Sequence, residues 1–257
     1  QKEIKAVILT HSETSTGVIN DLETISSFIR EHNTALSIVD CVTSLGACNV
    51  PVDQWHLDVV ASGSQKGYMI PPGLSFISMS QKAWKAAETS NLPKFYLNLK
   101  SYKKSLLSNS NPYTPAVNLI FALDEALKMM REEGLDNIFI RHEKHKLAIS
   151  NAVKALNLKL FADEQCLSPS VTAVATEEIN AEEFRKTIKN KFDILLAGGQ
   201  DHLKGKIFRV GHLGYINDRD ILGVISAISN TLLDLGKITN IQAGEALAVV
   251  SKHLERN

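Results

Sequence analysis

A single lysine, Lys66, stands among small and turn-forming residues in the stretch ASGSQKGYMIPPG, residues 61–73. It follows the apolar run LDVV, residues 57–60, so we expect it in a loop just beyond a buried strand. A lysine amine held in such a place can attack a carbonyl group and bond to it as a Schiff base. The alternative is an ordinary solvated loop lysine, which this stretch alone does not exclude.

Two further polar stretches follow predicted strands, HSETSTG at 11–17 and DCVTSLG at 40–46. Ligands of open α/β sheets bind at the carboxyl ends of strands, so a hydroxyl-rich loop, Asp40 and Lys66 are expected at one rim. Pyridoxal phosphate chemistry needs such a set: a carboxylate for the pyridine nitrogen, a lysine, and polar groups for the ring oxygen and phosphate. Taken alone, Asp40 is equally suited to cap a helix, and the threonine-rich loop to form a turn.

The elements that must position these loops alternate between short apolar runs and helical stretches. Strands are predicted at residues 6–10, 35–40, 57–61 and 74–78, and helices at 21–32 and 81–88. Such a pattern predicts an α/β fold with a mostly parallel sheet and helices on both faces. Residues 89–115 are polar and aperiodic and are expected to be a long irregular segment.

The second half of the sequence predicts a smaller α+β domain. A long helix at 116–133 ends at Gly134, and another is expected at 138–155. Short strands at 158–161, 171–175 and 206–210 then alternate with a helix at 181–189, and helices at 218–235 and 241–254 close the chain. We therefore place a large domain at 1–134 and a small one at 135–257.

Composition narrows the function classes. Among 257 residues, 28 are Lys or Arg and 28 are Asp or Glu, so zero formal charge argues against a nucleic-acid or polybasic membrane surface. Cys41, Cys48 and Cys166 form no C-x-x-C pair, which argues against a metal framework and suits a reducing compartment such as the cytoplasm. No apolar run reaches the roughly 18 residues that a membrane span needs.

The motifs taken in order resemble a known family. THSETSTG, VDCVTSLG, SGSQKGYMIPPG, NPYTP, the glycine pair at 198–199 and GKIFRVGHLG are similar to the class V aminotransferases of fold type I. The alanine–glyoxylate and serine–pyruvate aminotransferase group is the most similar, and the resemblance runs across nearly the whole chain. It implies pyridoxal-phosphate-dependent transamination between alanine or serine and a 2-oxo acid such as glyoxylate or pyruvate.

The resemblance also implies a role for each site residue. Lys66 binds the cofactor as a Schiff base and moves the proton between substrate and cofactor, and Asp40 pairs with the pyridinium nitrogen. Arg209 binds the substrate carboxylate as a planar bidentate donor, the alternative being a strand arginine in a structural ion pair. The other implied cofactor contacts are Thr14 at the phenolic oxygen, Val42 on the ring face, Gln65 at the phosphate, and Tyr113 or Thr114 at the neighbouring subunit's phosphate.

Other polar residues near these motifs are assigned supporting parts. His11 and His212 are interpreted as supporting polar residues, because the family gives the proton transfer to the lysine. Cys41 and Cys48 are expected to be small core residues rather than nucleophiles.

The sequence departs from the family pattern at its start, because members are normally longer at the N-terminus. We therefore expect a C-terminal fragment completed by a separate N-terminal fragment of the same subunit, within a homodimer that shares its active sites. One alternative is a non-catalytic or fragment subunit of a larger assembly, since some members carry a soluble-hydrogenase small-subunit name. Another is a cysteine desulfurase, which is disfavoured because Gln65 rather than histidine precedes Lys66.

Overall fold

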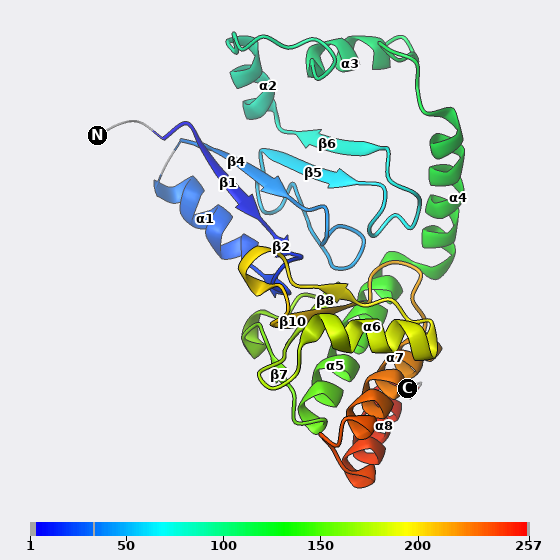
Figure 1. Cartoon of the computed structure of the whole chain (residues 1–257). Coiled ribbons are helices and arrows are strands. Elements are labelled where there is room, and N and C mark those ends of the chain that lie inside the picture. Colours follow the sequence, from blue (N-terminus) through cyan, green and yellow to red (C-terminus); the bar gives the residue numbers. More distant parts are fainter. Residues whose placement is uncertain (1–3, 33, 256–257) are drawn as a thin grey trace.

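The computed structural model describes residues 4–32 and 34–255, and its first half is built on a four-stranded sheet (Figure 1). The strand order is β1-β4-β5-β6, with bounds Ala6–Thr10, Leu36–Asp40, Val59–Gly63 and Ser75–Met79. β1, β4 and β5 run parallel, and β6 pairs antiparallel to β5. The predicted mostly parallel sheet is confirmed, with each strand bound shifted by at most two residues.

One face of this sheet carries its own small core. α1 (Leu22–His32) lies there, and Leu22 packs with Val39 and Val60 from β4 and β5. Alternate strand residues point to opposite faces, so Ile8 of β1 projects to the other face, where it is exposed. The alternating pattern of burial thus follows directly from the strand period of two.

The middle of the chain corrects one expectation. Residues 89–115 are not wholly irregular, because α3 (Leu99–Leu106) lies between α2 (Gln81–Glu88) and α4 (Val117–Glu133). The Asn98 side chain caps α3 by accepting from the Lys100 amide. No residue of α3 is buried. Leu99, Tyr102 and Leu106 do recur at helical spacing, but the helix has only eight residues in a polar segment, so this stripe was missed.

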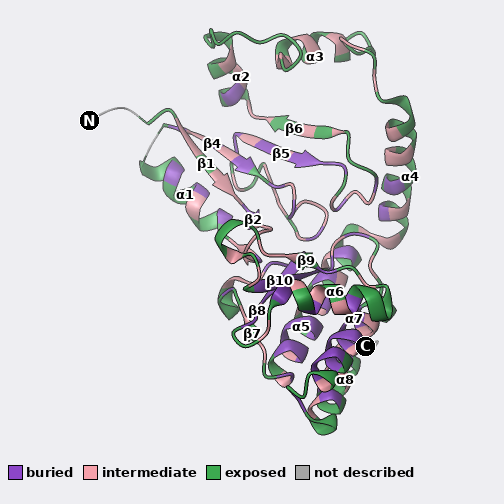
Figure 2. Cartoon of the chain, viewed as in Figure 1, coloured by how far each residue is buried: buried purple, intermediate pink, exposed green. Residues whose placement is uncertain are grey.

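The second half contains an antiparallel sheet packed against helices. The strand order is β7-β8-β10-β9, with bounds Lys159–Leu160, Val171–Ala175, Ile207–Gly211 and Ala197–Gly198. The helices are α5 (Leu135–Ala155), α6 (Ala181–Phe192), α7 (Asp218–Asp234) and α8 (Asn240–Leu254), with short 3-10 turns at Glu164–Cys166 and Asp201–Leu203. Figure 2 shows that buried residues concentrate in this half.

A short hairpin joins the two halves and was not predicted. β2 (Ser12–Glu13) pairs with β3 (Val18–Ile19) directly after β1. Val18 forms a bridge with Leu167, and the Ser12 and Ser168 hydroxyls lie 2.8 Å apart. Each strand has two residues, too few for a visible alternation of apolar and polar side chains.

The passage between the halves runs through α4 and α5 (Figure 1). Gly134, between the two helices, has a φ of +83°. A domain boundary at this residue stays a prediction. In the part of the chain that the structure describes, every helix is too short or too polar to cross a lipid bilayer.

Candidate functional site

The three loops singled out in the sequence begin side by side at one edge of the first sheet. Thr10 and Asp40 end β1 and β4 and are register partners, and Asp40 pairs with Ala61, two residues before the carboxyl end of β5. The next residue of each strand continues the ladder, since the His11 amide donates to Asp40 O and the Cys41 amide to Ala61 O, both at 2.9 Å. Parallel strands therefore deliver these loops to one rim, as the sequence predicted.

Asp40 ends β4 with an exposed side chain. Its Oδ1 accepts a 2.8 Å hydrogen bond from the Val42 amide, which turns the chain into the next loop. Among residues 4–32 and 34–255, no cation forms an ion pair with Asp40. The carboxylate is oriented by its own backbone and keeps its charge uncompensated.

The Lys66 loop packs backbone to backbone against the Asp40 loop. A Cβ added to Gly67 would lie 2.2 Å from Leu45 O and 2.9 Å from Gly46 Cα, so only glycine permits this approach. Ser64 closes the loop by donating to Pro71 O at 2.8 Å and accepting from the Leu74 amide at 3.1 Å. The loop that carries Lys66 is thus fixed relative to the loop that follows Asp40.

Lys66 is half-buried in this rigid surround. Within the described residues its Nζ makes neither a hydrogen bond nor an ion pair. A partly desolvated amine with no partner is available to an incoming carbonyl group.

A chain of contacts brings Arg209 of β10 to the same rim. Its Nη1 donates to Thr14 O at 2.8 Å, and the Thr14 hydroxyl lies 2.6 Å from the Thr43 hydroxyl. Thr43 is three positions beyond Asp40, so a residue from the second half of the chain reaches the Asp40 loop. The Nε of Arg209 donates to Gly198 O at 2.9 Å, which fixes the plane of the guanidinium.

Arg209 is a buried cation held by carbonyl groups rather than by a carboxylate. The residue is 7% exposed, and burial, followed by the nearby charge of Arg185, lowers the pKa of its guanidinium. The Glu13 carboxylate acts on it electrostatically but forms no ion pair with it within the described chain. The substrate-binding role of Arg209 stays a prediction. A buried guanidinium of this kind is suited to bind a carboxylate ligand.

The remaining predicted site residues divide into two groups. Val42 is half-buried in the Asp40 loop, and the exposed Gln65 places its Oε1 2.9 Å from where a Cβ on Gly63 would lie. Tyr113 instead donates to Phe95 O at 3.0 Å, in a ring cluster with Phe95, Tyr96 and Tyr102. The structure does not bring Tyr113 or the exposed Thr114 to Lys66 within this chain.

The two histidines near the motifs are buried and uncharged. His11 Nδ1 lies 2.9 Å from the Ser44 hydroxyl, and His212 Nε2 lies 3.0 Å from the Thr172 hydroxyl. Burial lowers the pKa of His11 to about 4 and that of His212 to about 3. The His11 contact links the loops after β1 and β4, and the His212 contact links the segment after β10 to β8.

The cysteines close to the rim show little nucleophilic character. Burial raises the pKa of Cys41 to about 11 and that of Cys48 to about 12. Since the thiolate is the nucleophile, the expectation that they are small core residues agrees with these shifts.

Acid is expected to destabilise the fold through the buried histidines. His142, whose pKa burial lowers to about 4, joins His11 and His212. Unfolding exposes them to water, where they bind protons below pH 6.5, so each lowers the free energy of unfolding by about 1.4 kcal/mol per pH unit from 6.5 down toward its folded pKa. Denaturant melts at pH 7.5 and 5.5 measure this loss. His56 is exposed, so His56→Gln should show the same fall of the free energy of unfolding with pH as the unchanged protein. A denaturation midpoint that is equal at the two pH values would contradict the prediction.

Thr43 and Gly214 are two site-adjacent residues that the sequence did not single out. Thr43 lies in the VDCVTSLG motif, where its hydroxyl group could have marked it as a candidate site residue. Gly214 lies in GKIFRVGHLG, yet only the folded chain shows that a Cβ on it would lie 3.4 Å from Lys66 O.

The gathered groups suit pyridoxal phosphate by their chemistry. The rim presents an unpaired carboxylate, an unpaired amine and an unpaired guanidinium, together with the paired hydroxyls of Thr14 and Thr43. These match a protonated pyridine nitrogen, a carbonyl carbon, a substrate carboxylate and the ring's phenolic oxygen, respectively.

Comparison with known proteins gives the family. The chain belongs to the class V aminotransferases, because the model of that family, Aminotransferase class-V, matches residues 1–212. A "Soluble hydrogenase 42 kDa subunit" of Anabaena cylindrica is 59% identical over 98% of this chain and 65% of its own length. A "Serine--glyoxylate aminotransferase" of Methylorubrum extorquens is 36% identical over 99% of this chain and 65% of its own length.

A solved structure supports the same fold. The "ureidoglycine-glyoxylate aminotransferase" of Bacillus subtilis superimposes with a TM-score of 0.88 at 33% identity, covering 96% of this chain and 65% of that one. The fold-type I architecture expected from the motifs is confirmed, and the family implies pyridoxal phosphate as cofactor. The chain spans just under two thirds of the length of these relatives.

Proposed function

We propose that the protein acts as a pyridoxal-phosphate-dependent aminotransferase. It moves the amino group of a small amino acid, alanine or serine, to a 2-oxo acid such as glyoxylate or pyruvate. The observation that carries the proposal is the rim itself, where the loops of Asp40 and Lys66 pack together and Arg209 reaches them through Thr14. None of the three charged side chains forms an ion pair within the described chain. A buried guanidinium without an ion pair, such as that of Arg209, is costly unless a ligand completes it.

Each residue then has a task. When bound, pyridoxal phosphate supplies the electron sink that makes the substrate Cα–H bond acidic. Asp40 holds the proton on the pyridine nitrogen, and the Lys66 amine carries the proton between the substrate Cα and the cofactor C4′. Arg209 orients the substrate by its carboxylate, and Thr14, Val42 and Gln65 contact the cofactor's oxygen, ring face and phosphate.

The names of the relatives support glyoxylate as the amino-group acceptor. Curated relatives include serine–glyoxylate and "L-aspartate--glyoxylate" aminotransferases, which share glyoxylate in their names while differing in the amino donor. We propose a homodimer in a reducing compartment such as the cytoplasm, with Tyr113 or Thr114 reaching the neighbouring subunit's phosphate. That a separate N-terminal fragment completes the subunit remains a prediction.

A second candidate rests on the name of a similar relative. The Anabaena protein is called a soluble hydrogenase subunit, so a non-catalytic role in a larger assembly is the alternative. Such a subunit has no need of a lysine that bonds covalently to a carbonyl cofactor. Cofactor binding therefore separates the two functions.

The test is a covalent trap followed by an activity screen. The purified protein is mixed with pyridoxal phosphate, reduced with borohydride and digested, and the cofactor mass is expected on the peptide that contains Lys66. Alanine and serine are then offered as donors with glyoxylate as acceptor, and glycine formation is measured. Trapping on scattered surface lysines, with no glycine formed, would favour the non-catalytic role.

Arg209→Lys is expected to weaken substrate binding much more than cofactor binding. Lysine keeps the charge but loses the planar fork that Gly198 and Thr14 orient. We expect the KM for the amino donor to rise by about tenfold to a thousandfold, with cofactor absorbance retained. Titration with alanine, serine and amines that lack a carboxylate measures the change, and equal losses for carboxylate-containing and carboxylate-free amines would contradict the assignment.

A further inference from the structure

One turn of the second half, residues 212–217, lies directly against the backbone of Lys66. Gly214 in this turn has a φ of +84°, and a Cβ on it would lie 3.4 Å from Lys66 O and 3.3 Å from Met69 Cγ. A side chain here would be strained by the positive φ and would lie in van der Waals contact with the lysine's own peptide oxygen. The Gly214 turn is therefore a direct neighbour of the Lys66 backbone.

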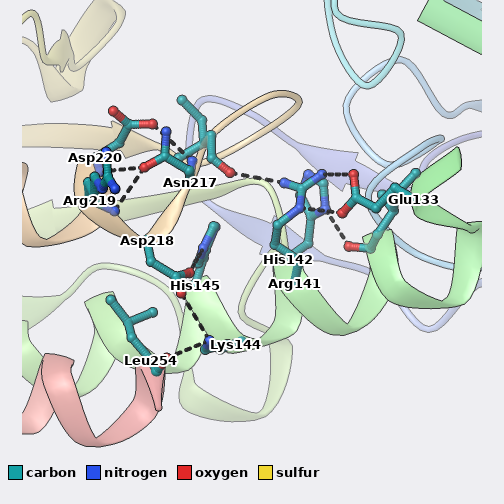
Figure 3. Close-up of polar contacts among 12 residues, drawn as sticks. Glu133, Arg141, His142, Lys144, His145, Asn217, Asp218, Arg219, Asp220 and Leu254 are labelled. Atoms are coloured by element: carbon teal, nitrogen blue, oxygen red, sulfur yellow. Dashed lines mark hydrogen bonds and ion pairs between the residues drawn. The ribbon is translucent and has the colours of Figure 1, made fainter. Parts of the chain in front are cut away.

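Two adjacent residues of α5 hold the turn (Figure 3). Arg141 Nη1 donates to Gly214 O at 2.9 Å and to Ile216 O at 3.1 Å, while His142 Nε2 accepts from the Gly214 amide at 3.1 Å. His142 Nδ1 lies 2.7 Å from Ile138 O, an acceptor only, so Nδ1 carries the proton and Nε2 is left to accept. Both polar groups of Gly214 are thus bound by α5.

Arg141 is in turn oriented by Glu133, the last residue of α4. Its Nε lies 2.6 Å from Oε1 and its Nη2 3.0 Å from Oε2, a bidentate pair with side chains only 19% and 31% exposed. Paired forks of this kind fix direction as well as distance. A carboxylate at the end of α4 therefore aims the guanidinium of α5 at the Gly214 turn.

We propose that Arg141 and His142, oriented by Glu133, are positioning residues that set the place of the Lys66 amine through the Gly214 turn. The inference rests on the proposed function, because it concerns the lysine of that site. Proton transfer by Lys66 needs its amine within hydrogen-bond reach of two carbon atoms in turn, so small displacements of its backbone lower the rate. Neither positioning residue needs to touch substrate or cofactor.

The first test uses the cofactor-free protein. The Met69 and Ile70 amides donate to Lys66 O and Ser64 O, at 3.0 and 3.3 Å, and so report on the Lys66 loop. In the variants Arg141→Gln and Glu133→Gln, we expect the hydrogen exchange of the Met69 and Ile70 amides to become faster by about tenfold or more. Arg131→Gln is the matched control, since Arg131 is exposed on α4 and its side chain contacts no described partner.

The second test uses the cofactor-loaded protein. Arg141→Gln should lower kcat by about ten- to a hundredfold and shift the pH midpoint of the visible absorbance band. The KM for the amino donor should stay within about threefold, because Arg209 is untouched. Arg141→Lys keeps the positive charge next to Glu133 but loses the bidentate guanidinium. Its kcat and band midpoint should therefore lie between those of Arg141→Gln and the unchanged protein.

The outcomes separate the claims. If Arg141→Gln matches Arg131→Gln in exchange and kcat, the proposal is overturned. Faster exchange with an unchanged kcat and band midpoint also overturns it, because the contact is then only structural. Should Arg141→Gln fail to fold, Arg141→Lys decides by the same readouts. A protein without any cofactor band would count against the proposed function, while the exchange data would still decide whether the turn positions the Lys66 loop.

Discussion

Replacing Lys66 with alanine is expected to abolish the visible absorbance of the cofactor-loaded protein and nearly all amino-group transfer. The loop would keep its shape, because Ser64, Gly67 and the Gly46 contact hold it without help from the lysine side chain. The lost amine is both the covalent attachment and the proton carrier. Loss of the carrier alone lowers rates by about 10²- to 10⁴-fold, so the total effect should be at least that large.

Two further variants show whether the effect belongs to the amine of Lys66. Lys66→Arg keeps a positive charge but cannot form the Schiff base, so it should behave like Lys66→Ala. Lys104→Ala, at an exposed lysine of α3, should change neither absorbance nor rate. Added small amines should partly restore transfer to Lys66→Ala, because they replace the missing base. Residual band intensity in Lys66→Ala equal to that of the unchanged protein would show that another residue binds the cofactor.

Local patterns in the sequence predicted the five-residue strands and the loops that follow them, but not the two-residue strands β2, β3 and β9. The helix expected at 81–88 and the strand expected at 171–175 have those same bounds in the structure. Lys66 and Asp40 were found because a charged residue after a buried run is a local signal. Their meeting at one rim followed from the parallel order of strands, which the alternation of strand and helix indicates.

Contacts between distant parts of the chain could not be predicted in this way. Arg141 and Gly214 are 73 positions apart, and Arg209 and Thr14 are 195 apart. No periodicity in either segment specifies its partner, because such contacts depend on how the two halves pack. Tyr113 was placed by resemblance at a neighbouring subunit's phosphate, which stays a prediction, and in this chain its ring joins an aromatic cluster that no sequence pattern indicated.

Gly67→Ala is expected to give a large loss of stability, because the new methyl group has no room between the two loops. The new Cβ would lie 2.2 Å from Leu45 O and 2.9 Å from Gly46 Cα, and both are backbone atoms that cannot rotate away. Either the Lys66 loop or the Asp40 loop must then move. A loss of more than about 4 kcal/mol in the free energy of unfolding follows, because such clashes are among the few causes of changes that large.

Gly223→Ala is the matched comparison for this change. Gly223 lies within α7, and a Cβ there would meet nothing within 4 Å. Alanine in a helix interior is favoured over glycine by roughly 0.5–1 kcal/mol, so this variant should be slightly more stable. Urea melts of the two variants measure the contrast, and similar midpoints would mean that the two loops do not meet at Gly67. If Gly67→Ala folds at low temperature, its cofactor band should still be lost, because the loop movement that relieves the clash separates Lys66 from Asp40.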